Sequence, residues 1–212
     1  MKSELLIPSR RMALRRGVIA CLLIISGFGV AVAQSKGYSC DPSPDVKAEL
    51  KKIDKVADED LLYKQRRERQ LAIAQELLKK YPDDYFVRRR YQDLRRSGFD
   101  SDIEALVAEY RAQMEQRPND PVAVNLYARL VTGRNTKEAI EKMEQLIAST
   151  PDFPQPYYGL AQIYTYPNFR DPTKSKENLK KWIAKCPDST STLNLLSRSD
   201  DKELMGEIAR KL

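Results

Sequence analysis

DPVAVNLYARLVTGRNTKEAIEKMEQLIASTP, from Asp120 to Pro151, has the pattern of two amphipathic helices separated by a turn. Asp120 and Pro121 are suited to a helix start, because the carboxylate can accept hydrogen bonds from free amides and proline needs no N–H at the first position. Gly133 can take the left-handed conformation that ends a helix. Apolar residues then recur at three- and four-residue steps from Ala139 until Pro151. The segment predicts a helix, a turn and a second helix.

The same pattern follows at once in DFPQPYYGLAQIYTYPNFRDPTKSKENLKKWIAKCP, from Asp152 to Pro187. Prolines that end helices, at positions 82, 118, 151 and 187, are spaced 36, 33 and 36 residues apart. A period of roughly 34 residues is typical of stacked helix pairs, in which each pair buries its apolar face only against its neighbours. No segment alternates apolar and polar residues as a strand would. The sequence therefore predicts an all-α fold built from repeated helix pairs.

These repeats resemble the tetratricopeptide family. The resemblance lies in the terminal prolines and in two sets of positions: large residues early in the first helix (Tyr127, Tyr157, Leu160, Tyr164) and small residues where the helices cross closely (Ala128, Ala139, Ala161). The sequence departs from the family at Leu77, Leu146 and Trp182, where a small residue is usual, and at Arg95, where an aromatic is usual. The resemblance covers roughly residues 60 to 200 and implies a right-handed α-solenoid of tetratricopeptide-like helix pairs.

The first 33 residues have the features of a cleavable export signal. A basic start precedes an apolar run from Gly17 to Val32, and the small residues Ala31 and Ala33 mark a cleavage site before Gln34. A membrane anchor is the alternative, but the run is shorter than the roughly 20 residues a span needs. We expect a periplasmic or secreted protein with no stable membrane insertion after cleavage.

The route of export has two interpretations. The segment from Ser9 to Arg15 resembles the twin-arginine motif, with Ala13 where a bulkier residue is usual. Alternatively, translation begins at Met12 and an ordinary secretory signal remains. The second interpretation is favoured, because helical repeats hold no cofactor that must be loaded before export.

Composition excludes several classes of function. The whole chain has a net charge of +7, but the predicted signal carries five basic residues and one acid, which leaves +3 for residues 34–212. This balance gives no reason to expect a nucleic-acid partner. The chain contains no histidine, the commonest general base and metal ligand. No glycine-rich phosphate loop, Cys-x-x-Cys pair or calcium loop is present either. We expect no enzyme activity, no cofactor and no metal site.

The predicted mature chain has two parts. Residues 34–57 are expected to form a tether and an N-terminal capping helix that begins at Ser43, and residues 58–212 the helical repeat domain. A long helix is expected from Asp58 to Lys80, and two further helices after Pro187, around residues 193–196 and 204–212. The two cysteines of this part, Cys40 and Cys186, are expected to be separated by several helix layers. Burial of an unpaired Cys186 is therefore favoured over a disulfide, which the exported compartment would permit.

The family resemblance implies a binding groove along the first helix of each pair. Its positions are Phe86, Arg89, Asp93 and Arg96, then Val122, Asn125 and Arg129, then Gln155, Tyr158 and Gln162. The candidate site residues among them are Arg89, Arg96, Asn125, Arg129, Tyr158 and Gln162. Guanidinium groups suit carboxylates, so the expected partner is a protein or peptide with acidic side chains or a free C-terminus. A solvated helix face is the alternative, because charge runs such as that from Arg88 to Arg90 are commonly exposed.

Three classes of function follow. The leading one is a non-catalytic exported scaffold that binds a protein or peptide. The second rests on the segment from Tyr164 to Pro172 and on Cys186-Pro187, which look like helical regions that precede thioredoxin-fold redoxin domains in some exported bacterial proteins. It implies an accessory or truncated N-terminal module, and a coding sequence that continues past Leu212 into such a domain would favour it. The third, a hydrolase or carbohydrate-active enzyme, is disfavoured by the missing histidine.

Overall fold

The computed structural model describes residues 38–98, 102–192 and 206, and these lie within one structural unit, Lys36–Leu212. Helices follow one another along this part of the chain, with no strand among the described residues. They are α1 (Pro44–Lys55), the 3-10 turn η1 (Val56–Asp58), α2 (Tyr63–Lys80), α3 (Tyr85–Arg96), α4 (Ile103–Gln116), α5 (Pro121–Val131), α6 (Thr136–Ser149), α7 (Gln155–Ile163), η2 (Pro167–Phe169) and α8 (Pro172–Lys185). The all-α prediction is confirmed.

Polar side chains begin most of these helices, as the sequence predicts. A side-chain oxygen accepts a hydrogen bond from a main-chain amide of the first turn at Ser43, Asp84, Asp102, Asp120, Asn135 and Asp171. Gly133 has a φ of 91° after α5, so it takes the left-handed conformation that L side chains rarely adopt. Local sequence signals therefore locate these helix ends.

The predicted helix from Asp58 to Lys80 starts later, at Tyr63, so its expected start was wrong. The 3-10 turn η1 follows α1 directly, and its Val56 is buried. Burial of Val56 keeps this turn against the first helices instead of letting it join α2. Gln65 then accepts a hydrogen bond from the main-chain amide of Leu62 at 3.2 Å, which begins the new helix.

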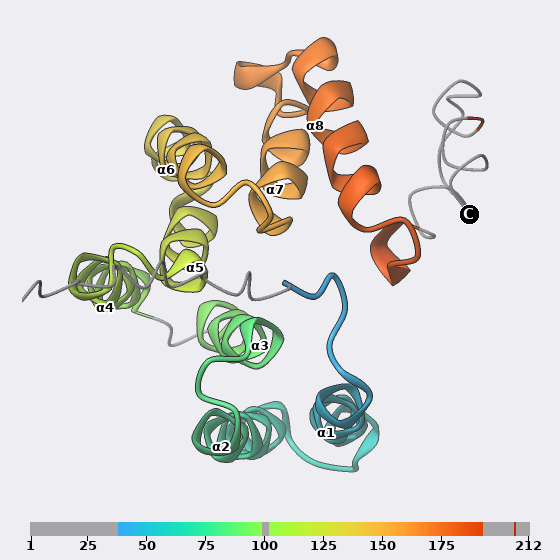
Figure 1. Ribbon diagram of the computed structural model, residues 1–212. Helices are drawn as coiled ribbons and strands as arrows, with labels where there is room; N and C mark the ends of the chain where they lie inside the picture. Colours follow the sequence, from blue (N-terminus) through green and yellow to red (C-terminus); the bar gives the residue numbers. More distant parts are fainter. Residues whose placement is uncertain (1–37, 99–101, 193–205, 207–212) are drawn as a thin grey trace, which may run out of the picture. The chain divides into compact units, whose positions relative to one another are not determined.

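Successive helices pack side by side along the chain (Figure 1). Helix α5 contacts both α4 and α6, and α7 contacts both α6 and α8. Alternate helices also touch, α3 with α5 and α5 with α7. The largest core cluster centres on α5, where Leu126, Tyr127 and Ala128 have no exposed surface. This arrangement brings α3, α5 and α7 together along one side of the stack.

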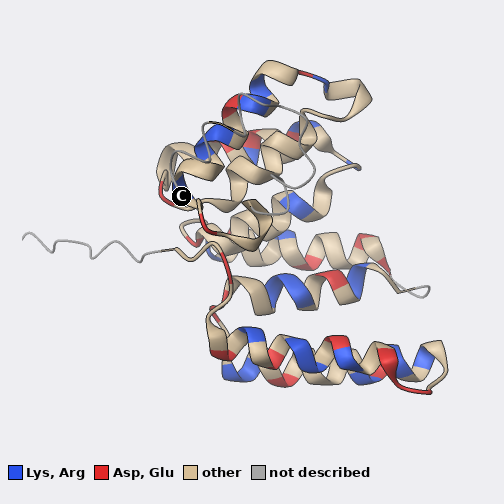
Figure 2. Cartoon of the chain, turned by 90° about the vertical axis from the view of Figure 1, so that its right-hand side faces the viewer, with Lys and Arg blue, Asp and Glu red and all other residues tan. Residues whose placement is uncertain are grey.

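Ion pairs connect helices that are distant in sequence. Lys80 of α2 contacts Glu49 of α1 at 3.1 Å, and the buried Arg88 of α3 contacts Asp120, the N-cap of α5, at 3.1 Å. Lys and Arg also alternate with Asp and Glu along individual helices (Figure 2). Exposed pairs contribute little to stability, about 0 to 1 kcal/mol each. The buried Arg88 pair is expected to help fix the position of α3 on α5.

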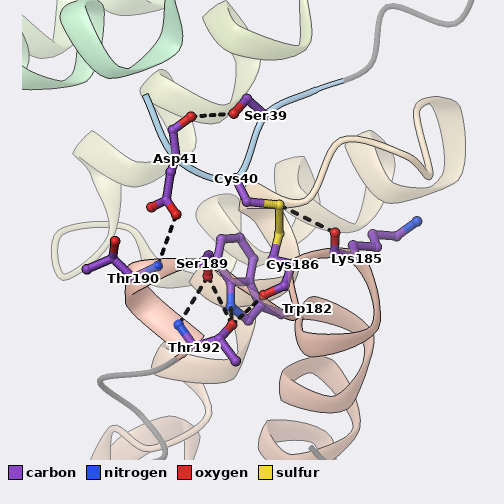
Figure 3. Close-up of a disulfide and its surroundings, with 9 residues drawn as sticks. All are labelled: Ser39, Cys40, Asp41, Trp182, Lys185, Cys186, Ser189, Thr190 and Thr192. Atoms are coloured by element: carbon purple, nitrogen blue, oxygen red, sulfur yellow. Dashed lines mark hydrogen bonds between the residues drawn. A yellow bond between two sulfur atoms is a disulfide. The ribbon is translucent and has the colours of Figure 1, made fainter. Parts of the chain in front are cut away.

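A disulfide joins Cys40, before α1, to Cys186 at the end of α8, with a Cα–Cα distance of 5.6 Å (Figure 3). The sequence-based preference for an unpaired Cys186 was therefore wrong, although the predicted burial of Cys186 is confirmed. The two regions meet because the segment before α1 runs back along the stack. The Tyr38 ring packs edge-on against Phe153, with 4.9 Å between centroids. The Thr190 amide donates to the Asp41 carboxylate at 3.0 Å.

Some predictions fall on residues that the structure does not describe. These are the export signal of residues 1–33 and the two helices expected around residues 193–196 and 204–212. Within the part of the chain that is described, no helix combines the length and apolar character needed to cross a membrane.

Candidate functional site

A cavity of about 330 Å³ lies among helices α3, α5 and α7. All six predicted site residues line it: Arg89 and Arg96 from α3, Asn125 and Arg129 from α5, and Tyr158 and Gln162 from α7. Three alternate helices thus contribute to one cavity. We call it the α3–α5–α7 cavity.

The arginines of the α3–α5–α7 cavity are partly engaged within the protein. Arg129 contacts Asp93 with 2.6 Å between Nη2 and Oδ1, and its Nη1 donates to the Gln92 oxygen at 2.9 Å. Arg89 lies farther from the same carboxylate, with 3.9 Å between Nε and Asp93 Oδ2. Arg129 is therefore a positioned structural group as well as a lining residue. Arg89 has the looser contact and is better placed to change partner.

Two buried amide side chains in this cavity have unpaired atoms. Asn125 is 3% exposed, and its Nδ2 donates to the Tyr85 hydroxyl at 3.4 Å while its Oδ1 has no hydrogen-bond partner among the described residues. Gln155 is 6% exposed, and its Nε2 likewise lacks an acceptor there. Buried polar atoms are nearly always hydrogen-bonded, and an unpaired one costs about 1 to 3 kcal/mol. Two residues that line the cavity thus each have one buried amide atom, an acceptor on Asn125 and a donor on Gln155, without a partner among the described residues.

Tyr85 supplies a neutral hydroxyl to the cavity. Burial raises the pKa of Tyr85 above its usual value, and the positive charges of Arg89 and Arg129 only partly oppose that shift. The phenol therefore stays protonated at neutral pH and acts as a hydrogen-bonding group. The described residues contain no cluster of acidic, cysteine or histidine side chains that could hold a metal ion. The described side chains of the cavity offer hydrogen bonding and charge pairing.

Sequence reasoning omitted three residues that matter here. Tyr85 and Gln92 were not among the groove positions, and Gln155 was among them but not among the candidate site residues. Gln92 is fully buried and orients Arg129. A glutamine between Tyr91 and Asp93, in a segment rich in charge, gives no sign of burial in sequence. Only the packing of α3 against α5 reveals its role.

Comparisons with protein-family models, with curated proteins and with solved structures find no match to this chain.

Proposed function

We propose that this protein is an exported, non-catalytic helical-repeat scaffold that binds an extended segment of another protein in the α3–α5–α7 cavity. The observation that carries this proposal is the pair of unpaired buried amide atoms, Asn125 Oδ1 and Gln155 Nε2. A peptide main chain offers an N–H and a C=O at almost every residue. One bound peptide can therefore satisfy both atoms, the N–H donating to Asn125 and the C=O accepting from Gln155.

The partner is expected to carry acidic side chains or a free C-terminus. Asp93 already supplies a carboxylate to Arg129, so the cavity has a built example of the contact that such a partner would make. Arg89, 39% exposed in its side chain, keeps a distance of 3.9 Å from Asp93. A ligand carboxylate can approach Arg89 more closely than Asp93 does, without breaking the Arg129 pair. The adjoining Arg96 adds positive charge to the same rim.

Two features support the wider assignment. The disulfide between Cys40 and Cys186 is of the kind that persists in oxidising compartments, which favours export. Contacts between α3, α5 and α7 are those expected when the first helices of tetratricopeptide-like pairs stack into a right-handed solenoid.

Selection from two soluble peptide libraries tests this function, one with blocked and one with free C-termini. The proposal expects enrichment of acidic or free-carboxylate peptides, with affinity that weakens as salt rises because the arginine contacts are partly exposed. Enriched peptides should bind a Gln155→Met variant at least about tenfold more weakly than the wild type. If no sequence is enriched, or if enriched peptides bind Gln155→Met as well as the wild type, the cavity is not a peptide site.

A further inference from the structure

A second cavity, of about 540 Å³, lies between the start of α2, the end of α3 and the start of α4. It shares no lining residue with the α3–α5–α7 cavity. Leu71, Leu94 and Leu106 give it an aliphatic lining. Helices α3 and α4 contact each other less than the other successive pairs do, which leaves room between them. The volume lies in the range of roughly 300 to 1,000 Å³ that holds small organic ligands. We call it the α2–α4 cavity.

Arg67 lines the α2–α4 cavity, and two of its guanidinium nitrogens are unpaired within the described part of the chain. Its Nε and Nη2 atoms are buried and have no hydrogen-bond partner among the described residues. Burial lowers the pKa of Arg67; the nearby Arg90 lowers it further, whereas Tyr63 acts in the opposite direction. Guanidinium atoms withdrawn from water without an acceptor are costly. An anion bound beside Arg67 would remove that cost.

The start of α2, one turn before Arg67, also favours an anion. The first turns of α2 contain Lys64, Arg66 and Arg67, and the first turn has no acid. The amino end of a helix carries partial positive charge, so cations are disfavoured there and an anion is favoured. Arg66 donates to the Ala57 carbonyl at 3.0 Å, and Arg69 one turn later pairs with Glu59 at 2.6 Å. Arg67 has no comparable partner among the residues described.

The remaining charges of the cavity limit the charge of its ligand. Arg95 is paired with Glu109 at 2.5 Å, so its charge already has a partner and does not require the negative group of a ligand. Lys64 lines the cavity as well, and so do Glu68 and Asp102, whose carboxylate caps α4 by accepting from the Ala105 amide. These two acids would repel a ligand with several negative charges. A single negative charge placed at Arg67 avoids that repulsion.

We propose that the α2–α4 cavity binds a small amphiphilic monoanion, an apolar body with one carboxylate or sulfonate, whose charged group contacts Arg67. Leu71, Leu94 and Leu106 surround the apolar body. This site is separate from the proposed peptide site and does not depend on it.

Two fluorescent probes with the same ring system test the proposal on the disulfide-bonded protein produced from the full coding sequence. They are 8-anilinonaphthalene-1-sulfonate, which is anionic, and N-phenyl-1-naphthylamine, which lacks the sulfonate. Arg67→Met should weaken binding of the anionic probe about tenfold to a hundredfold, the equivalent of losing a hydrogen bond to a charged group. The same substitution should leave binding of the neutral probe within about twofold of wild type, because the apolar lining is unchanged.

Two further variants test whether the loss of affinity for the anionic probe is specific to the charge of Arg67. Arg69→Met removes the same charge from the same helix outside the cavity and should leave both affinities near wild type. Ala105→Trp fills the exposed rim and should weaken both probes, and it gives a second test if Arg67→Met does not fold. Equal affinity of the anionic probe for wild type and Arg67→Met overturns the proposal. So does unchanged binding of both probes to folded Ala105→Trp, or an equal loss in Arg69→Met.

Competition identifies the class of ligand. Decanoate should displace the anionic probe, whereas decan-1-ol at the same concentration should displace it at least about tenfold less well, since it lacks the charge. If a peptide with a C-terminal leucine carboxylate displaces the probe and decanoate does not, the cavity is a peptide site and the small-molecule proposal is wrong.

Discussion

Gln92 of α3 donates a hydrogen bond from its side-chain Nε2 to the main-chain oxygen of Leu126 in α5, across 2.8 Å. Its Oε1 accepts from Arg129 at 2.9 Å, so both ends of this fully buried amide are paired. Gln155 of α7 is also buried, but its Nε2 has no partner among the described residues. One glutamine thus holds two helices together, whereas the other lines a cavity and has a buried donor without a partner among the described residues.

This contrast predicts that replacing glutamine by methionine has different effects on the free energy of unfolding at the two positions. Gln92→Met should lower the free energy of unfolding by about 1 to 3 kcal/mol, because it removes the buried hydrogen bonds that the amide makes with the Leu126 carbonyl and with Arg129. Gln155→Met should change it by less than about 0.5 kcal/mol or raise it, because an unpaired donor is replaced by an apolar group of similar shape. Urea denaturation measures both. Equal losses in the two variants would contradict this assignment.

The disulfide should make a large contribution to stability. It closes a loop spanning 146 positions, from Cys40 to Cys186, and removal of a native disulfide typically costs about 2 to 5 kcal/mol. Cys40→Ala should show this loss in denaturation, and reduction of the wild type should match it. The neighbouring exposed substitution Ser39→Ala is the control and should have little effect. A wild-type protein whose stability is insensitive to reduction would refute the prediction.

Trp182 should be essential to the C-terminal part of the stack. It is 2% exposed, and its indole N–H donates to the Thr192 hydroxyl at 3.1 Å. Trp182→Ala should cost roughly 3 to 5 kcal/mol, as truncation of a core aromatic usually does. Tyr166, an exposed aromatic, is the matched control, and its replacement by alanine should cost less than about 0.5 kcal/mol. Similar denaturation midpoints for the two alanine variants would argue against burial of Trp182.

Alkaline pH should destabilise the fold partly through Tyr127. The Tyr127 side chain is buried, and its hydroxyl donates a hydrogen bond to Glu138. Burial is the larger cause and the Glu138 contact the second, and together they raise the pKa of Tyr127 to about 12. An unfolded tyrosine ionises near 10, so the unfolded chain releases this proton first. The stabilising effect is complete below about pH 10 and is lost as pH rises toward 12.

An absorbance titration of the phenolates checks this, with Tyr127→Phe as the comparison. The variant should lose one late-titrating group and show a smaller alkaline loss of stability. Burial also raises the pKa of Tyr110, so part of the loss should remain. If every tyrosine titrates near 10 in the folded protein, the pKa assigned to Tyr127 is wrong.

The helices could be predicted because their signals are local. Asp120, Pro121 and Gly133 act on their own or adjacent peptide groups, so a short segment contains the information needed to place α5. The spacing of helix-ending prolines then gives the number of residues in each pair. The start of α2 could not be found in this way. It depends on burial of Val56, which is a tertiary contact.

The sequence predicted six residues that line the cavity, but it did not predict which side chains pair with one another. All six predicted residues line one cavity, since α3, α5 and α7 lie next to one another. Sequence did not show that Asp93 holds Arg129 or that Arg88, within a charge run, is buried. Nor did it show that Cys40 reaches Cys186, since a short segment without regular structure can turn in any direction.

The central claim is that the unpaired amides of the α3–α5–α7 cavity bind a peptide main chain. The most direct test is the affinity of one selected fluorescent peptide, measured by anisotropy for wild type, Gln155→Met and the exposed control Gln145→Met. We predict that Gln155→Met binds at least about tenfold more weakly, as expected when a peptide carbonyl loses its donor. Gln145→Met should bind like wild type, and all three proteins should be equally stable. Undiminished affinity in a stable Gln155→Met protein would contradict the account.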